Sequence, residues 1–160
     1  MSKDKSGFVI KSETIVIKAP SSAVWEFVKD PNGCEEYSNG AIKAHVEGPV
    51  AVNSKITLKV KGLPTSHEVI SEVNIDHSIG WRRKLPIGGS TNRVQVLVPI
   101  EGEDGEKTKS TITLTAPGPI GLITYLFFKR RIVSAFDAYN NGLKGAAEAI
   151  EPLIAQPKNP

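Results

Sequence analysis

The chain has 160 residues, of which 39% are hydrophobic, which is enough apolar material for one compact domain and too little for two. Its 20 Lys and Arg residues against 17 Asp and Glu residues give a net charge of +3. The sequence has no basic stripe interleaved with aromatic residues, so we do not expect it to bind nucleic acid. The segment MSKDKSG is polar and lacks the apolar run of a secretory signal, and the longest apolar stretch, at 120–128, is far shorter than the roughly 20 residues of a membrane span. We therefore expect a soluble, cytoplasmic, single domain over 1–160, with an ordered core at about 8–152.

The first elements are a strand and a short helix that follow each other directly. The segment TIVIKA, at 14–19, alternates apolar and polar residues as a half-buried strand does, and Pro20 then suits the first turn of a helix. Val24, Phe27 and Val28 share one face of that helix, which Pro31 ends. After a short connector at 32–40 we expect six strands, at 41–47, 55–61, 66–76, 79–85, 91–100 and 108–116. Asp104-Gly105 predicts a hairpin between the last two.

A long helix is expected at the C-terminus. Apolar residues recur at helical spacing from Leu122 to Ile150, with Gly142 and Gly145 as possible weak points. A series of antiparallel strands closed by one helix belongs to the α+β class.

The order of these elements and three motifs resemble the START-like superfamily, also called SRPBCC, in its polyketide cyclase/dehydrase and lipid-transport branch. The motifs are IVIKAPSSAVWEFVKDP at the start, IGWRRKL in the middle and YNNGLKGAAEAIE near the end. The resemblance implies a helix-grip fold: a seven-stranded antiparallel sheet curls around the long C-terminal helix, with two short helices after the first strand. It also implies an apolar ligand cavity between sheet and helix, with Trp25 and Phe27 closing one end of the sheet. The segment Cys34–Tyr37 departs from the family, where a second tryptophan is common.

Strand alternation, applied to this fold, selects the side chains that are expected to face the cavity. Most of them are expected to be core, and the polar minority is expected to orient a ligand. The candidate ligand-binding residues are Tyr37, Leu58, His67, Val69, Ser71, Trp81, Arg83, Asn92, Val94, Val96, Ile112, Leu114, Ile132, Phe136 and Tyr139.

Several kinds of chemistry lack support in the sequence. His67 and His77 are too far apart along a strand to share a metal ion, and His45 is expected to face solvent, so we expect no metal and no cofactor. The motifs of serine hydrolases and of nucleotide- or dinucleotide-binding loops are absent. Cys34, the single cysteine, is expected to be a buried thiol rather than a nucleophile.

Two functions remain. The first is a carrier or sensor that binds an apolar small molecule or lipid. In this case, the run Leu122–Phe128, followed by a basic triplet, could form a cavity gate that transiently touches a membrane. The alternative, which we favour, is that the apolar run supplies the first core-facing turns of the helix. The second is a cyclase or aromatase in which His67, Arg83 or Tyr139 moves a proton. A stress-response or chaperone-partner module shares the fold, and oligomeric state is left open.

Arg83 carries the most specific expectation. Alternation places it on the same face as Ile79 and Trp81, where an unpaired charge would be costly. It therefore leans to the cavity mouth, pairs with a carboxylate of the protein, or binds the acidic group of an otherwise apolar ligand.

Overall fold

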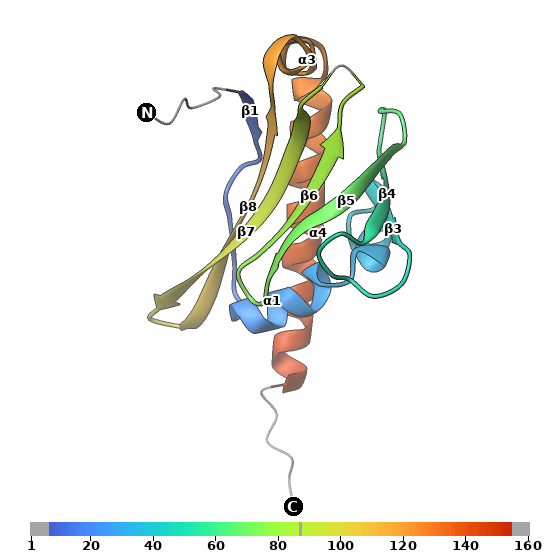
Figure 1. The fold of residues 1–160 in the computed structure, drawn as a ribbon. Coiled ribbons are helices and arrows are strands. Elements are labelled where there is room, and N and C mark those ends of the chain that lie inside the picture. The colour runs from blue at the N-terminus through green and yellow to red at the C-terminus, as the bar shows by residue number, and fades with distance from the viewer. Residues whose placement is uncertain (1–6, 87, 155–160) are drawn as a thin grey trace, which may run out of the picture.

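The computed structural model describes residues 7–86 and 88–154. An antiparallel sheet follows the order β1-β8-β7-β6-β5-β4-β3, with β2 as a further segment paired to β8. The sheet curls around one long helix (Figure 1), so the expected α+β helix-grip architecture is confirmed. The strands are β1 (Phe8–Lys11), β2 (Ile15–Ile17), β3 (Ile42–Val46), β4 (Lys55–Val60), β5 (Ser66–Asn74), β6 (Ser78–Lys84), β7 (Ser90–Gly102) and β8 (Gly105–Ala116).

The strand expected at 14–19 corresponds to β2 alone, and β1 is an additional segment before it that pairs with the same strand, β8. Lys11 pairs with Thr113 and Ile15 pairs with Ser110, so the chain from β1 to β2 holds one residue more than β8 over the same stretch. Ser12 lies in this irregular stretch, and its buried hydroxyl accepts a hydrogen bond from the Ile112 amide at 2.9 Å. The side chain thereby satisfies a backbone donor at the break.

Short helices close one end of the curled sheet. They are α1 (Ser21–Val28), the 3-10 turn η1 (Pro31–Gly33) and α2 (Cys34–Tyr37). Trp25 is 5% exposed and belongs to the core, as expected for a residue that plugs the sheet, while Phe27 is half-buried with its ring 6.0 Å from that of Tyr37. α1 ends before Pro31, where the Asp30 carboxylate accepts a hydrogen bond from the Asn32 amide.

The closing helix begins earlier than its apolar period predicted. It consists of α3 (Gly118–Ile123), the π-helical segment η2 (Thr124–Phe128) and α4 (Lys129–Ile154). α4 is continuous through Gly142 and Gly145, so the expected weak points do not interrupt it. No helix in the described part of the chain is both long enough and apolar enough to cross a membrane.

The core fills the space between the concave face of the sheet and α4. Ile79, Leu97, Phe136 and Leu143 are all at most 1% exposed. The β7–β8 hairpin predicted from Asp104-Gly105 is confirmed, with Gly102 opposite Gly105 and an exposed tip beyond the core.

Candidate functional site

Two cavities lie between the sheet and the closing helix. The outer cavity has a volume of about 260 Å³ and lies beside η2 and the first turns of α4. Apolar side chains dominate its wall. Its lining residues are Val60, Leu63, Pro64, Ser66, Glu68, Arg83, Leu85, Thr91, Arg93, Leu114, Ile120, Thr124, Phe128, Ile132 and Phe136.

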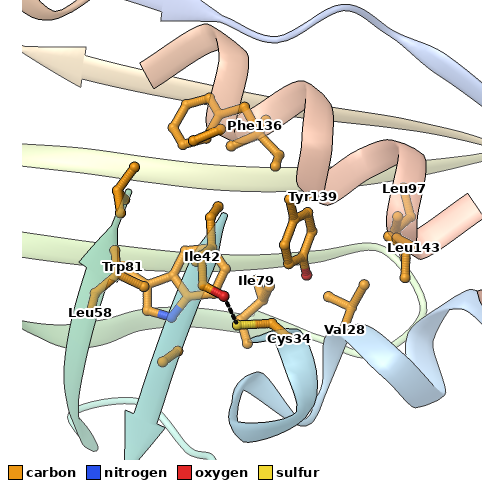
Figure 2. Close-up of a cluster of buried hydrophobic side chains, with 14 of the residues drawn as sticks. Val28, Cys34, Ile42, Leu58, Ile79, Trp81, Leu97, Phe136, Tyr139 and Leu143 are labelled. Atoms are coloured by element: carbon orange, nitrogen blue, oxygen red, sulfur yellow. Dashed lines mark hydrogen bonds between the residues drawn. The ribbon is translucent and has the colours of Figure 1, made fainter. Parts of the chain in front are cut away.

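The inner cavity is much smaller and lies deeper in the core, in the region that Figure 2 shows. Its volume of about 20 Å³ has room for a group the size of one water molecule. Arg93 and Phe136 line both cavities and therefore lie between them. The remaining lining residues are Val28, Pro31, Cys34, Ile42, Ala44, Leu58, Trp81, Gln95, Ile112 and Tyr139.

A buried ion pair forms the polar part of the outer cavity. Arg93 Nη2 lies 3.4 Å from Glu68 Oε1, and the two side chains are 11% and 5% exposed. Ser66 Oγ donates a second hydrogen bond to the same carboxylate oxygen at 2.8 Å. The guanidinium also lies 5.6 Å from the centre of the Phe136 ring and 5.9 Å from that of Trp81, a cation–π arrangement that favours its charge.

Two donors in this region have no hydrogen-bond partner among the described residues. They are Arg93 Nε and Trp81 Nε1, and both atoms are buried. Buried donors are normally satisfied, and an unsatisfied one costs free energy, so these atoms are suited to an acceptor oxygen supplied from outside the chain.

A chain of hydrogen bonds runs from the inner cavity through the buried core to Asn140 of α4. Tyr37 donates to Tyr139 at 3.0 Å, and Tyr139 donates to Gln95 Oε1 at 3.1 Å. Gln95 Nε2 donates to Ser110 Oγ at 3.1 Å, and Ser110 donates to Asn140 Oδ1 at 3.0 Å. Burial raises the pKa of both tyrosine hydroxyls, which therefore remain protonated at neutral pH.

Cys34 is a buried thiol, as expected. Its Sγ atom donates to the Ile42 carbonyl at 3.3 Å, as Figure 2 shows. Burial raises the pKa of this thiol to about 11, so very little of the nucleophilic thiolate forms at neutral pH.

The structure brings nine of the candidate ligand-binding residues to the two cavities or directly behind them. Leu58, Trp81, Ile112, Phe136 and Tyr139 line the inner cavity, while Arg83, Leu114, Ile132 and again Phe136 line the outer one. Tyr37 lies behind Tyr139, with the two ring centres 5.3 Å apart. Arg83 is exposed where it borders the outer cavity, which matches the alternative that places it at the mouth.

The predicted inward orientation of His67, Val69 and Ser71 is wrong. Ser66, Glu68 and Ile70 are the buried residues of this part of β5, and the His67 side chain is exposed. A register shift between Ile70 and Glu72 reverses the two faces of β5. Odd-numbered residues therefore point inward after the shift, as Val73 does, but outward before it. Ser71 lies on the outer face, where a methyl group on Gly80 would be 3.0 Å from its Oγ.

The predicted inward orientation of Asn92, Val94 and Val96 is also wrong. Asn92 is exposed, Val96 is 40% exposed, and Val94 shares their face of β7, whereas Gln95 and Leu97 are buried. Arg93 pairs across the sheet with Trp81 and Gln95 with Ile79, and cross-strand partners share a face. The apolar side of each strand predicted the wrong face, so Arg93, Gln95 and Glu68 were not among the candidates. The only sequence signal for this pair was the opposite charge of Glu68 and Arg93 on β5 and β7, the two strands that flank β6.

The histidines lie outside both cavities. His45, His67 and His77 are all exposed. In the described part of the chain, no group of three His, Cys, Asp or Glu side chains is arranged to hold a metal ion.

Solved structures with this fold share little sequence with the chain. A hypothetical protein of Helicobacter pylori matches with a TM-score of 0.68 and 10% identity, covering 91% of this chain and 90% of its own. The Zhui aromatase/cyclase of a Streptomyces species matches with a TM-score of 0.63 and 18% identity, covering 89% and 94%. A protein of Chromobacterium violaceum matches with a TM-score of 0.61 and 14% identity, covering 88% and 97%.

A comparison with curated proteins found no match. A family model described as polyketide cyclase/dehydrase and lipid transport, in contrast, matches residues 10–148, the stretch that contains all three motifs of the resemblance except the last three residues of the third. The chain therefore belongs to the polyketide cyclase/dehydrase and lipid-transport family.

Proposed function

We propose that the protein binds a hydrophobic small molecule or lipid in the outer cavity and acts as a carrier or sensor. The observation that supports this most is the outer cavity itself, about 260 Å³ with a mostly apolar wall between sheet and helix. Ligand sites are usually concave and apolar, with a few polar groups that fix orientation. An apolar ligand body beside Leu114, Ile132 and Phe136 fits this description.

The two arginines suggest different polar groups on the ligand. Arg93 is already neutralised by Glu68, so its free Nε–H suits a neutral acceptor such as a carbonyl oxygen. Arg83 borders the cavity in an exposed position, and none of the ion pairs in the described part of the chain includes it. We propose that Arg83 binds the acidic group of a ligand whose apolar part lies inside.

The first test is direct. The purified protein is extracted with organic solvent, and the extract is examined by mass spectrometry for a co-purifying apolar compound. Displacement of a fluorescent apolar probe then compares a fatty acid with its methyl ester. If no apolar compound co-purifies and neither compound displaces the probe, the carrier function is wrong.

Arg83→Ala is tested in the same assay beside Arg82→Ala, a neighbouring arginine that is also exposed and does not border the outer cavity. We expect wild type and Arg82→Ala to prefer the acid, and Arg83→Ala to lose that preference by about tenfold, as for one charge-assisted pair. Equal preference in all three proteins would show that Arg83 is only a surface charge.

The second candidate is an enzyme of the cyclase or aromatase kind. The fold shared with an aromatase/cyclase and the Tyr139 hydroxyl beside the inner cavity favour it. Of the three expected proton-transfer residues, however, His67 faces solvent and Tyr139 has a raised pKa, which makes it a weak acid at neutral pH. Time-dependent conversion of the extracted ligand by wild type, abolished in Tyr139→Phe, would favour the enzyme over the carrier.

A further inference from the structure

Four large apolar side chains are exposed at the start of the closing helix. Leu122, Ile123, Leu126 and Phe127 are 42%, 52%, 64% and 73% exposed, and we call them the apolar ridge. Their spacing of one, four and five residues keeps them on one side of the helix.

Ile120, Thr124 and Phe128 of the same segment line the outer cavity. The favoured expectation that the whole run faces the core is therefore wrong for the ridge. Such a concentration of exposed apolar area indicates an interaction surface.

The chain around the ridge carries cations and no acidic residues. Lys129, Arg130 and Arg131 follow it directly, and residues 107–136 contain no Asp or Glu. The adjoining turns are the β6–β7 turn, where a methyl group on Gly89 would lie 3.2 Å from Pro117, and the β4–β5 turn, whose Gly62 carbonyl accepts from Arg131 at 3.1 Å. Their segments, 82–100 and 48–67, likewise contain no Asp or Glu.

The acidic residues gather at the opposite end of the molecule. Figure 1 shows α3 at one end of the sheet, and α1 and the tip of the β7–β8 hairpin toward the other. Glu101, Glu103, Asp104 and Glu106 lie in or beside that tip, and further carboxylates flank α1 and α2. The net charge is only +3, but the charges are unevenly distributed, and one end of the molecule is cationic and apolar.

We propose that the α3 end docks on the surface of a membrane that contains anionic lipids. The apolar ridge enters the headgroup region, while Arg130, Lys84 and their neighbours contact lipid phosphates. A convex helical ridge framed by cations has the character of an interfacial membrane anchor, in which apolar insertion and attraction to anionic lipid act together. Arg83, Thr124 and Phe128 border the outer cavity at this same end, so docking would bring the cavity to the lipid from which a ligand is taken.

This proposal extends the ligand-binding function but can be measured without any ligand. Wild type is sedimented with phosphatidylcholine vesicles, with and without phosphatidylglycerol, at low and high salt. We expect binding to the anionic vesicles only, and weaker binding at high salt because salt screens the attraction. Probe displacement in the absence of vesicles tests the cavity separately, so failure of one function is distinguishable from failure of the other.

Two variants and two matched controls test the surface. Leu126→Ser/Phe127→Ser removes the centre of the ridge, and Ile75→Ser changes an equally exposed residue, 71%, in the distant β5–β6 turn. Lys84→Gln/Arg130→Gln removes two exposed cations, one at the last residue of β6 and one three residues after Phe127, and Lys18→Gln/Lys109→Gln removes two exposed cations elsewhere. We expect Leu126→Ser/Phe127→Ser to lower the affinity for anionic vesicles by at least about tenfold. Lys84→Gln/Arg130→Gln should lower it by about fivefold per charge, and the two control variants should change it little.

All five proteins should share one circular dichroism spectrum and nearly one melting temperature, because every changed residue is exposed. The proposal is wrong if wild type does not sediment with anionic vesicles, or if the ridge variant binds as its control does. It is also wrong if wild type forms a dimer that the ridge substitutions dissociate and shows no vesicle binding, since the ridge is then an interface between copies.

Discussion

Gly142 and Gly145, three positions apart on α4, have very different surroundings. A methyl group on Gly142 would overlap the carbonyl group of Tyr37, so α2 and α4 approach each other at a point where only glycine fits. Gly145 is exposed, and apart from the adjoining backbone of its own helix no atom of the described chain lies within 4 Å of the position a methyl group would take. The same substitution at the two positions therefore tests opposite effects.

We expect Gly142→Ala to destabilise the protein by about 3 kcal/mol, because α2 must move away from α4. Gly145→Ala is the matched control, and it should stabilise the helix by about 0.5–1 kcal/mol through its greater helix propensity. Urea denaturation of the three proteins measures both changes. A Gly142→Ala midpoint at or above that of wild type would show that the helices do not depend on this contact.

The buried pair of Arg93 and Glu68 shows what alternation cannot predict at the level of single residues. In β7 the sequence offers two parities, one with Val94 and Val96 and one with Arg93 and Gln95. Hydrophobicity favours the first, but the second is buried because each polar residue finds a partner on another element. Such partners are separated by 25 and 15 positions in the sequence, and only the register of the sheet brings them together.

At the scale of elements, α4 was the most predictable part of the site. Its apolar period predicted Ile132, Phe136 and Tyr139 as inward residues, and all three are at most 6% exposed. β5 was predictable only after its bulge, because one extra residue reverses the faces and leaves no mark in the hydrophobic pattern. The face of α4 was thus easier to predict than the faces of these strands.

Phe136→Ala tests the role of α4 as one wall of the core. Phe136 is 1% exposed and separates the two cavities, so we expect its truncation to cost about 3–5 kcal/mol. Phe127→Ala, on an exposed part of the same closing segment, should change stability by less than about 0.5 kcal/mol. Both free energies come from urea denaturation. Equal, small effects would remove Phe136 from the core.

At the scale of the whole molecule, one core joins the sheet to every helix that packs on it. Trp25 on α1 and Trp81 on β6 belong to the same cluster of buried residues, although they lie on elements far apart in the sequence. The cluster also includes Ile132 and Leu143 of α4. A core shared in this way predicts that no part of the domain unfolds alone.

The two tryptophans are the only ones in the chain and provide a direct test of this cooperativity. Trp25→Phe leaves a probe in the sheet, and Trp81→Phe leaves a probe in the short helix that closes its end. Each substitution changes stability to a different extent, so fluorescence is compared with far-ultraviolet circular dichroism of the same variant during urea denaturation. We expect the two signals to share one midpoint in each variant, because the remaining tryptophan and the backbone lose their structure in one transition. If fluorescence of the Trp25 probe changes at lower urea than the circular dichroism signal, the short helices form a separate unit, and the single-domain interpretation is wrong.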